Sequence, residues 1–134
     1  MLTQFSPLHI PCLLTSLPMF LGGLFHGLTR PRAALLTWGM PPSIASSPSA
    51  QTVYYGHSMR TSTLGLLTLI FYTQGNLHAV DTSMAVMGAY CGIADCTILW
   101  YWGNRKVIAL RLASVLGIAM WGLLGLTARG GGAV

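Results

Sequence analysis

The chain has 134 residues, of which 53% are hydrophobic and only 7% are charged, and it carries two Asp, no Glu and a net charge of +5. A soluble domain carries about 25% charged residues, so this chain has too little charge to cover a soluble globule and is expected to be an integral membrane protein. Its seven basic residues are scattered along the chain, a pattern that does not predict a nucleic-acid-binding surface.

Four apolar stretches are long enough to cross a bilayer, which takes about 20 residues of helix. In chain order, they cover residues 9–28, 53–74, 80–102 and 107–127. The first contains Pro18 near its middle, where a proline is expected to kink the helix. The sequence therefore predicts an all-α protein, in which residues 1–134 form a single membrane domain built as a bundle of four transmembrane helices.

The connections differ in length. The first, residues 29–52, contains an apolar segment at 33–39 that is too short to span, and we expect a short interfacial or re-entrant helix there, with Trp38 at headgroup depth. Its second part is rich in Ser, Pro and Ala and is typical of a flexible loop. Tight turns are expected at 75–78 and 103–106, and a flexible glycine-rich tail at 128–134.

Basic residues in the connections predict the orientation. Arg30, Arg32, Arg105 and Lys106 lie in the first and third connections, whereas only Arg129 lies on the opposite side of a four-pass chain. By the positive-inside rule, the basic connections are cytoplasmic. We expect a multi-pass protein of the endoplasmic reticulum, with both termini lumenal.

Two opposite charges occupy equal depths in the predicted bundle. Arg60 lies seven residues into the second apolar stretch and Asp95 lies seven residues before the end of the third, so each is roughly 10 Å below the cytoplasmic surface. An ionisable group inside a bilayer costs roughly 2.5–3.5 kcal/mol and is rarely kept without a partner or a function. We therefore expect Arg60 and Asp95 to be in direct contact.

Helical spacing indicates which way Asp95 faces. Asp81, Gly88, Gly92 and Asp95 share one face of the third helix, and small residues let membrane helices approach closely, so Asp95 is expected to face the bundle. Asp81 is about 21 Å from Asp95 along the axis. The two acids are therefore not a catalytic pair, and Asp81 is expected to stabilise the start of its own helix.

Other polar residues are expected near the depth of Asp95. The predicted catalytic residues are Asp95, Arg60, His57 and Tyr54, and the predicted substrate-binding residues are Arg111, His26 and Ser114. The alternative interpretation is a structural ion pair with polar contacts between helices. The three Cys and four His show no metal-ligand spacing, and no nucleotide-binding motif is present, so neither a metal nor a cofactor is expected.

Several short motifs carry a family resemblance: residues 27–31, the sequence LLTWGMP at 35–41, residues 54–66 with Arg60 and Gly65, and GIAD at 92–95 with Gly103 at the helix end. Through them the chain resembles a family of small four-pass fungal membrane proteins of formerly unknown function. Some members resemble membrane-bound epoxide hydrolases of polyketide pathways, of the aurovertin and citreoviridin type. The resemblance implies an enzyme of fungal secondary metabolism acting on a lipophilic, polyketide-like intermediate, and Arg60 and Asp95 match the family's recurring polar positions. Arg111 does not fit the pattern of this family, because a histidine or a neutral residue is expected at its position.

Two hypotheses follow. In the first, the chain is a hydrolase-like enzyme whose lipophilic substrate enters from the bilayer: Asp95 acts as general base on water, Arg60 holds its carboxylate ionised, and Tyr54 or His57 polarises an epoxide or carbonyl oxygen. Hydrolysis, epoxide opening and cyclisation all fit this set of residues. In the second, the chain is a non-catalytic scaffold that associates with other pathway enzymes. A small carrier ranks lower, because the lumenal half offers few polar groups.

Overall fold

The computed structural model describes residues 5–131, and within this range the chain is helical with no β-strand. The α-helices are α1 (Ile10–Leu21), α2 (Gly27–Thr29), α3 (Pro31–Trp38), α4 (Pro42–Ala45), α5 (Pro48–Thr73), α6 (Leu77–Val86), α7 (Gly92–Trp102), α8 (Ile108–Leu123) and α9 (Leu126–Gly130). Short 3₁₀ turns, η1 (Pro7–His9) and η4 (Arg105–Val107), precede α1 and α8, and the π-helical segments η2 (Gly22–His26) and η3 (Met87–Cys91) join α1 to α2 and α6 to α7.

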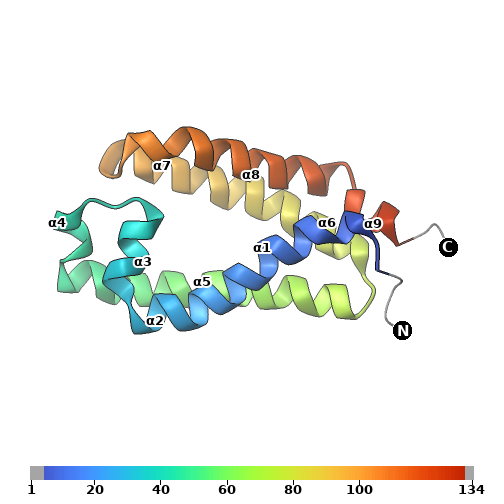
Figure 1. Ribbon diagram of the computed structural model, residues 1–134, viewed down its shortest axis with the longest axis horizontal. Coiled ribbons are helices and arrows are strands. Elements are labelled where there is room, and N and C mark those ends of the chain that lie inside the picture. The colour runs from blue at the N-terminus through green and yellow to red at the C-terminus, as the bar shows by residue number, and fades with distance from the viewer. Residues whose placement is uncertain (1–4, 132–134) are drawn as a thin grey trace.

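The helices form two layers along the long axis of the molecule (Figure 1). In one layer α1 packs against α5, and in the other α6 and α7 pack against α8. The layers meet where α5 packs on α6, close to the end at which both chain termini lie. At the opposite end, α3 and α4 bridge them: Leu35, Met40 and Ala45 form a buried cluster with Leu99 of α7.

Three helical segments are long and apolar enough to cross a membrane, as in a multi-pass membrane protein: Pro7–Thr29, Leu77–Trp102 and Arg105–Leu123. These correspond to the first, third and fourth predicted crossings. Helix α5, which contains the second, has 26 residues but is not among them. Its N-terminal half carries many polar side chains, so α5 is long enough to cross a membrane but is less apolar than the other three segments. The all-α class is therefore confirmed, and three of the four predicted crossings have the required length and hydropathy.

Glycines permit the closest contacts between these helices. A Cβ atom on Gly88 would lie 2.5 Å from the backbone nitrogen of Ala119, and one on Gly65 would lie 2.5 Å from that of Phe20. Gly88 and Gly92 thus form the surface on which α8 packs, as the small-residue face predicts. Beside Gly65, the Ser62 hydroxyl donates to the Phe20 carbonyl at 2.9 Å, which gives α5 and α1 a polar contact as well.

The first connection contains more regular structure than expected. The short helix predicted at 33–39 is present as α3, but the part expected as flexible loop forms α4 and the first turn of α5. Pro42 and Pro48 stand at the starts of these helices, and the Ser47 hydroxyl accepts a hydrogen bond from the Ala50 amide at 3.5 Å. Proline and serine favour helix starts because the first amides lack intrahelical partners. Helix α1 continues through Pro18, and the wider π-helical turn follows at Gly22.

The C-terminal segment also differs from the prediction of a flexible tail at 128–134. Residues 126–130 form α9, while 132–134 lie outside the described residues. The buried Asp81 carboxylate accepts hydrogen bonds from the amides of Thr127 at 3.1 Å and Ala128 at 2.8 Å. Asp81 therefore caps α9, and the prediction that it stabilises its own helix was wrong. That helix, α6, is capped by Asn76, which accepts from the Ala79 amide at 3.2 Å.

Candidate functional site

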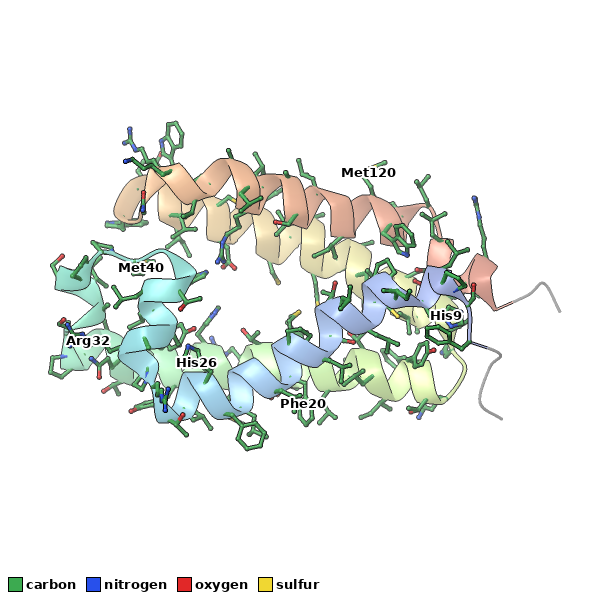
Figure 2. The ribbon with its side chains drawn as sticks, in the orientation of Figure 1. His9, Phe20, His26, Arg32, Met40 and Met120 are labelled. Atoms are coloured by element: carbon green, nitrogen blue, oxygen red, sulfur yellow. The ribbon has the colours of Figure 1, made fainter. Side chains whose placement is uncertain are left out.

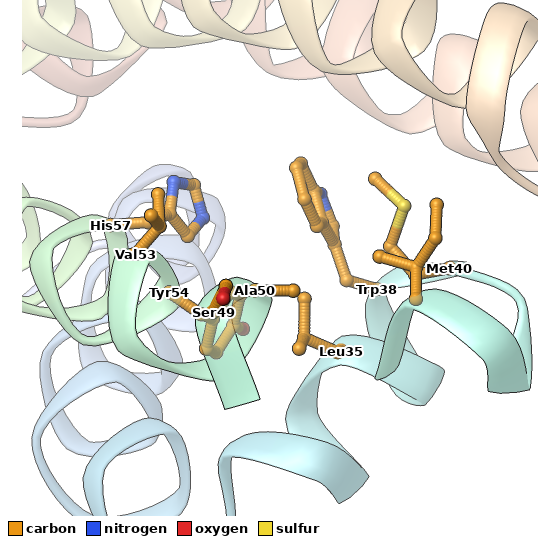
Figure 3. Close-up of a pocket in the computed structure, with 9 residues that line it drawn as sticks. Leu35, Trp38, Met40, Ser49, Ala50, Val53, Tyr54 and His57 are labelled. Carbon is orange, nitrogen blue, oxygen red and sulfur yellow. The ribbon is translucent and has the colours of Figure 1, made fainter. Parts of the chain in front are cut away.

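A cavity of about 480 Å³ lies where α3, α4 and the first half of α5 meet (Figure 3). Its walls are mainly aliphatic and aromatic, and they are formed by Leu35, Trp38, Met40, Ile44, Ser49, Ala50, Val53, Tyr54 and His57. The size and the apolar lining are those of a small-molecule site with a few polar groups. Val53 is 75% exposed, so the cavity opens at the side of α5.

Three aromatic rings meet at this cavity. The indole of Trp38 stacks on the imidazole of His57, with ring centroids 5.0 Å apart and planes inclined by 27°. The Tyr54 ring lies 5.3 Å from His57 and 6.2 Å from Trp38. Tyr54 and His57 are three residues apart on α5 and therefore share a face, and Figure 3 shows the His57 and Trp38 rings over the same pocket.

Asp95 and Arg111 face these rings from the opposite layer. The Asp95 carboxylate lies within electrostatic range of the His57 imidazole, the Arg111 guanidinium and the Trp38 indole N–H. Arg111 and Asp95 also act on the Tyr54 hydroxyl. Each of these side chains is partly buried. The Asp95 carboxylate of α7 thus lies in the same region as an indole from α3, an imidazole and a phenol from α5, and a guanidinium from α8.

The groups are close but do not form contact ion pairs. Among residues 5–131, no basic nitrogen lies within 4.0 Å of a carboxylate oxygen. The Trp38 N–H is buried and makes no hydrogen bond within 3.5 Å. Within the described part of the chain, the Asp95 carboxylate therefore has no basic side chain in direct contact with it.

Of the seven predicted site residues, Tyr54 and His57 line the cavity, whereas Asp95 and Arg111 are partly buried on α7 and α8 and are not part of its lining. The predicted contact between Arg60 and Asp95 is wrong, because Arg60 is exposed and makes no ion pair within 4.0 Å. Arg60 lies on an exposed side of α5, whereas Tyr54 and His57 on the same helix are partly buried. A predicted match in depth does not bring two side chains together when one of them faces away from the bundle, and Arg111 on α8 lies within electrostatic range of Asp95 instead.

The two other predicted substrate-binding residues lie apart from the cavity lining. His26 is exposed at the end of η2. Ser114 is exposed on α8, and its hydroxyl donates to the carbonyls of Leu110 at 2.7 Å and Arg111 at 3.1 Å.

Trp38 is the main site residue that sequence reasoning missed, because it was assigned to headgroup anchoring. One signal was available: Trp38 ends an apolar segment too short to cross a membrane, and such a segment needs another surface to cover its apolar side chains. The described residues contain no group of three or more His, Cys, Asp or Glu side chains that could hold a metal ion.

Comparison with known proteins places the chain in a family. The sequence profile of a domain of unknown function, DUF4267, matches residues 16–125, a range that includes α5 and every residue around the cavity. No curated protein and no solved structure gives a significant match. Because the matched range covers most of the chain, this protein belongs to the DUF4267 family.

Proposed function

We propose that this protein is a small integral membrane enzyme of fungal secondary metabolism that acts on a lipophilic, polyketide-like intermediate. The reaction is an acid–base hydrolysis, an epoxide opening or a cyclisation. The observation that carries the proposal is an apolar cavity lined by the Trp38, Tyr54 and His57 rings, with the partly buried Asp95 carboxylate within electrostatic range of His57 and Tyr54. A structural ion pair alone does not need the imidazole, the phenol or the cavity.

The proposal includes a fourth crossing by α5. This helix has 26 residues and is about 39 Å long, against a hydrocarbon core of about 30 Å. Both termini lie at one end of the molecule (Figure 1), as an even number of crossings requires. Figure 2 shows Arg32 at the end opposite to His9. The basic end faces the cytoplasm by the positive-inside rule, and both termini face the lumen of the endoplasmic reticulum.

The substrate enters from the bilayer. The exposed Val53 at the side of α5 marks the opening, and the lining beyond it is apolar. A hydrophobic molecule already dissolved in the membrane reaches the cavity without crossing water. The stacked rings of Trp38 and His57 present flat faces, which suit an unsaturated or planar substrate.

The catalytic roles follow from the charges around the cavity. Asp95 removes a proton from water as the water oxygen forms a bond to an epoxide carbon, and the carbon–oxygen bond of the ring breaks. The ring oxygen takes a proton from Tyr54 or His57, and the proton held by Asp95 later restores that donor. One water is added and nothing is oxidised or reduced. Arg111, rather than Arg60, supplies the positive charge that favours the ionised form of the Asp95 carboxylate.

The test compares lipid extracts of cells that express the wild-type protein, Asp95→Asn or His57→Gln. His78→Gln serves as a matched control, because His78 is exposed at the other end of the bundle. The catalytic variants are expected to accumulate an unreacted precursor while remaining folded, and the control is expected to form product. Product formation by folded Asp95→Asn protein at the wild-type level would instead identify a scaffold that assists other pathway enzymes.

A further inference from the structure

A second cavity lies between α5, α6 and η3, and its lining includes the exposed side chains of Leu67 and Val86. Its volume is about 210 Å³, and it is lined by Leu64, Leu67, Thr68, Thr82, Ser83, Val86 and Met87. No charged side chain contributes to this lining. The catalytic roles described above do not use any of these residues.

The three hydroxyl groups of the second cavity already have partners within their own helices. Thr68 donates to the Leu64 carbonyl at 2.9 Å, Thr82 to that of His78 at 2.8 Å, and Ser83 to that of Ala79 at 2.8 Å. The walls therefore offer no free hydroxyl proton to a ligand. The remaining lining is aliphatic apart from the Met87 thioether, so the cavity favours an apolar chain over a group that needs a hydrogen-bond donor.

Both cavities lie on the same face of α5. His57 lines the first cavity and Leu64 lines the second, and seven residues correspond to about two helical turns, so these side chains are aligned. Val53 and Leu67 lie on a neighbouring row of the same face and also line the first and second cavities. His57 and Leu67 are ten residues apart, a separation of about 15 Å along the helix axis.

We infer that the second cavity holds the apolar arm of the substrate whose reacting group lies between His57 and Asp95. This inference rests on the proposed function and adds the shape of the substrate. A carbon chain advances about 1.25 Å per bond, given bonds of about 1.5 Å at tetrahedral angles. A molecule that reaches both cavities across this separation of about 15 Å has an unbranched or conjugated arm of about 12 carbons, attached to a compact polar or epoxide-bearing end.

The probe is a terminal epoxide with a chain of about 12 carbons that carries a photoreactive diazirine at its far end. The full chain in lipid nanodiscs is illuminated with the probe, and the labelled peptides are mapped by mass spectrometry. Leu67→Trp narrows the second cavity. Leu66→Trp is its matched control, because Leu66 and Leu67 are 40% and 41% exposed but only Leu67 lines the cavity. Ser83→Leu narrows the cavity from the opposite wall.

Labelling is expected within residues 64–68 and 82–87 of the wild-type protein and of Leu66→Trp, and is expected to fall several-fold in Leu67→Trp and Ser83→Leu. Thermal unfolding and size-exclusion profiles identify any variant that fails to fold. Equal labelling in all four proteins overturns the inference. Equal labelling by a probe whose epoxide is replaced by an alkane end also overturns it, because the cavity is then a general slot for lipid chains.

A second readout separates this inference from the proposed reaction. Diol formation is measured from 1,2-epoxyalkanes of increasing chain length. Position-specific, epoxide-dependent labelling without diol formation supports the substrate shape and contradicts epoxide hydrolysis. Diol formation that is independent of chain length and unchanged in Leu67→Trp supports the hydrolase and overturns the arm-binding role of the second cavity.

Discussion

Trp38 stacks on His57 with their ring centroids 5.0 Å apart, and this contact joins a short helix from the first connection to the face of α5 that looks toward Asp95. The stack fixes one wall of the cavity and limits the orientations available to the imidazole. A catalytic imidazole gains from such support, because proton transfer depends on the direction of its ring nitrogens.

Replacing Trp38 by Leu is expected to lower stability by about 0.5–1.5 kcal/mol through loss of the aromatic contacts, and to lower turnover further because His57 is no longer held. Trp100→Leu is the control, since Trp100 is 52% exposed and lies outside the cavity lining. Thermal unfolding and product formation measure the two effects. A Trp38→Leu protein with wild-type turnover would show that the stack has no part in positioning His57.

Arg111→Gln is expected to reduce product formation strongly, because Asp95 loses the guanidinium that favours its charged form. Arg60→Gln removes the same charge from an exposed position on α5 and is expected to leave most activity intact. Product formed per folded protein decides between the two arginines. Equal losses in both variants would contradict the assignment of Arg111 as the partner of Asp95.

Asp81→Ala is expected to destabilise the end of the bundle near the termini. The carboxylate accepts two amide hydrogen bonds from α9, and hydrogen bonds to a charged group are worth about 1.5–3 kcal/mol each. Asp81→Asn retains one carbonyl acceptor and is expected to show a smaller loss. Limited proteolysis of α9 and thermal unfolding measure the change. Unaltered protection of α9 in both variants would argue against the cap.

Two glycine positions form a matched pair for testing the contact between the helices of the second layer. Gly88→Ala places a methyl group 2.5 Å from the Ala119 nitrogen and is expected to cost about 1–3 kcal/mol through overpacking. A methyl group on Gly117 would meet no other atom within 4 Å, so Gly117→Ala is expected to be neutral or to favour the helix by up to about 1 kcal/mol. Unfolding midpoints in one detergent provide the comparison, and a tolerated Gly88→Ala would mean that α8 packs elsewhere.

Reporter tags at the two termini are expected on the same, lumenal side of the membrane, because both ends of the chain lie at one end of the bundle. A glycosylation site or a pH-sensitive fluorescent protein at each terminus reads the side. A tag inserted between Asn104 and Arg105 is expected in the cytoplasm. Tags on opposite sides at the termini would mean that α5 does not cross.

Local sequence patterns were sufficient for much of the fold. Hydropathy and length predicted the membrane class and the long helices, because burial in lipid requires about 20 apolar residues regardless of what the helix packs against. The face carrying Gly88 and Gly92 was also predictable, since helical periodicity aligns residues three and four apart. For the same reason, His57 and Tyr54 were expected on one face of α5.

Only the tertiary structure determined which side chains of different helices lie close to one another. Depth along a helix is encoded locally, but the direction in which one helix faces another depends on the packing of the whole bundle. That packing brought Arg111 rather than Arg60 within electrostatic range of Asp95, put Trp38 in the lining of the cavity, and placed Asp81 at the start of α9. A one-dimensional pattern contains the spacing of these residues, whereas their contacts depend on which helices lie side by side.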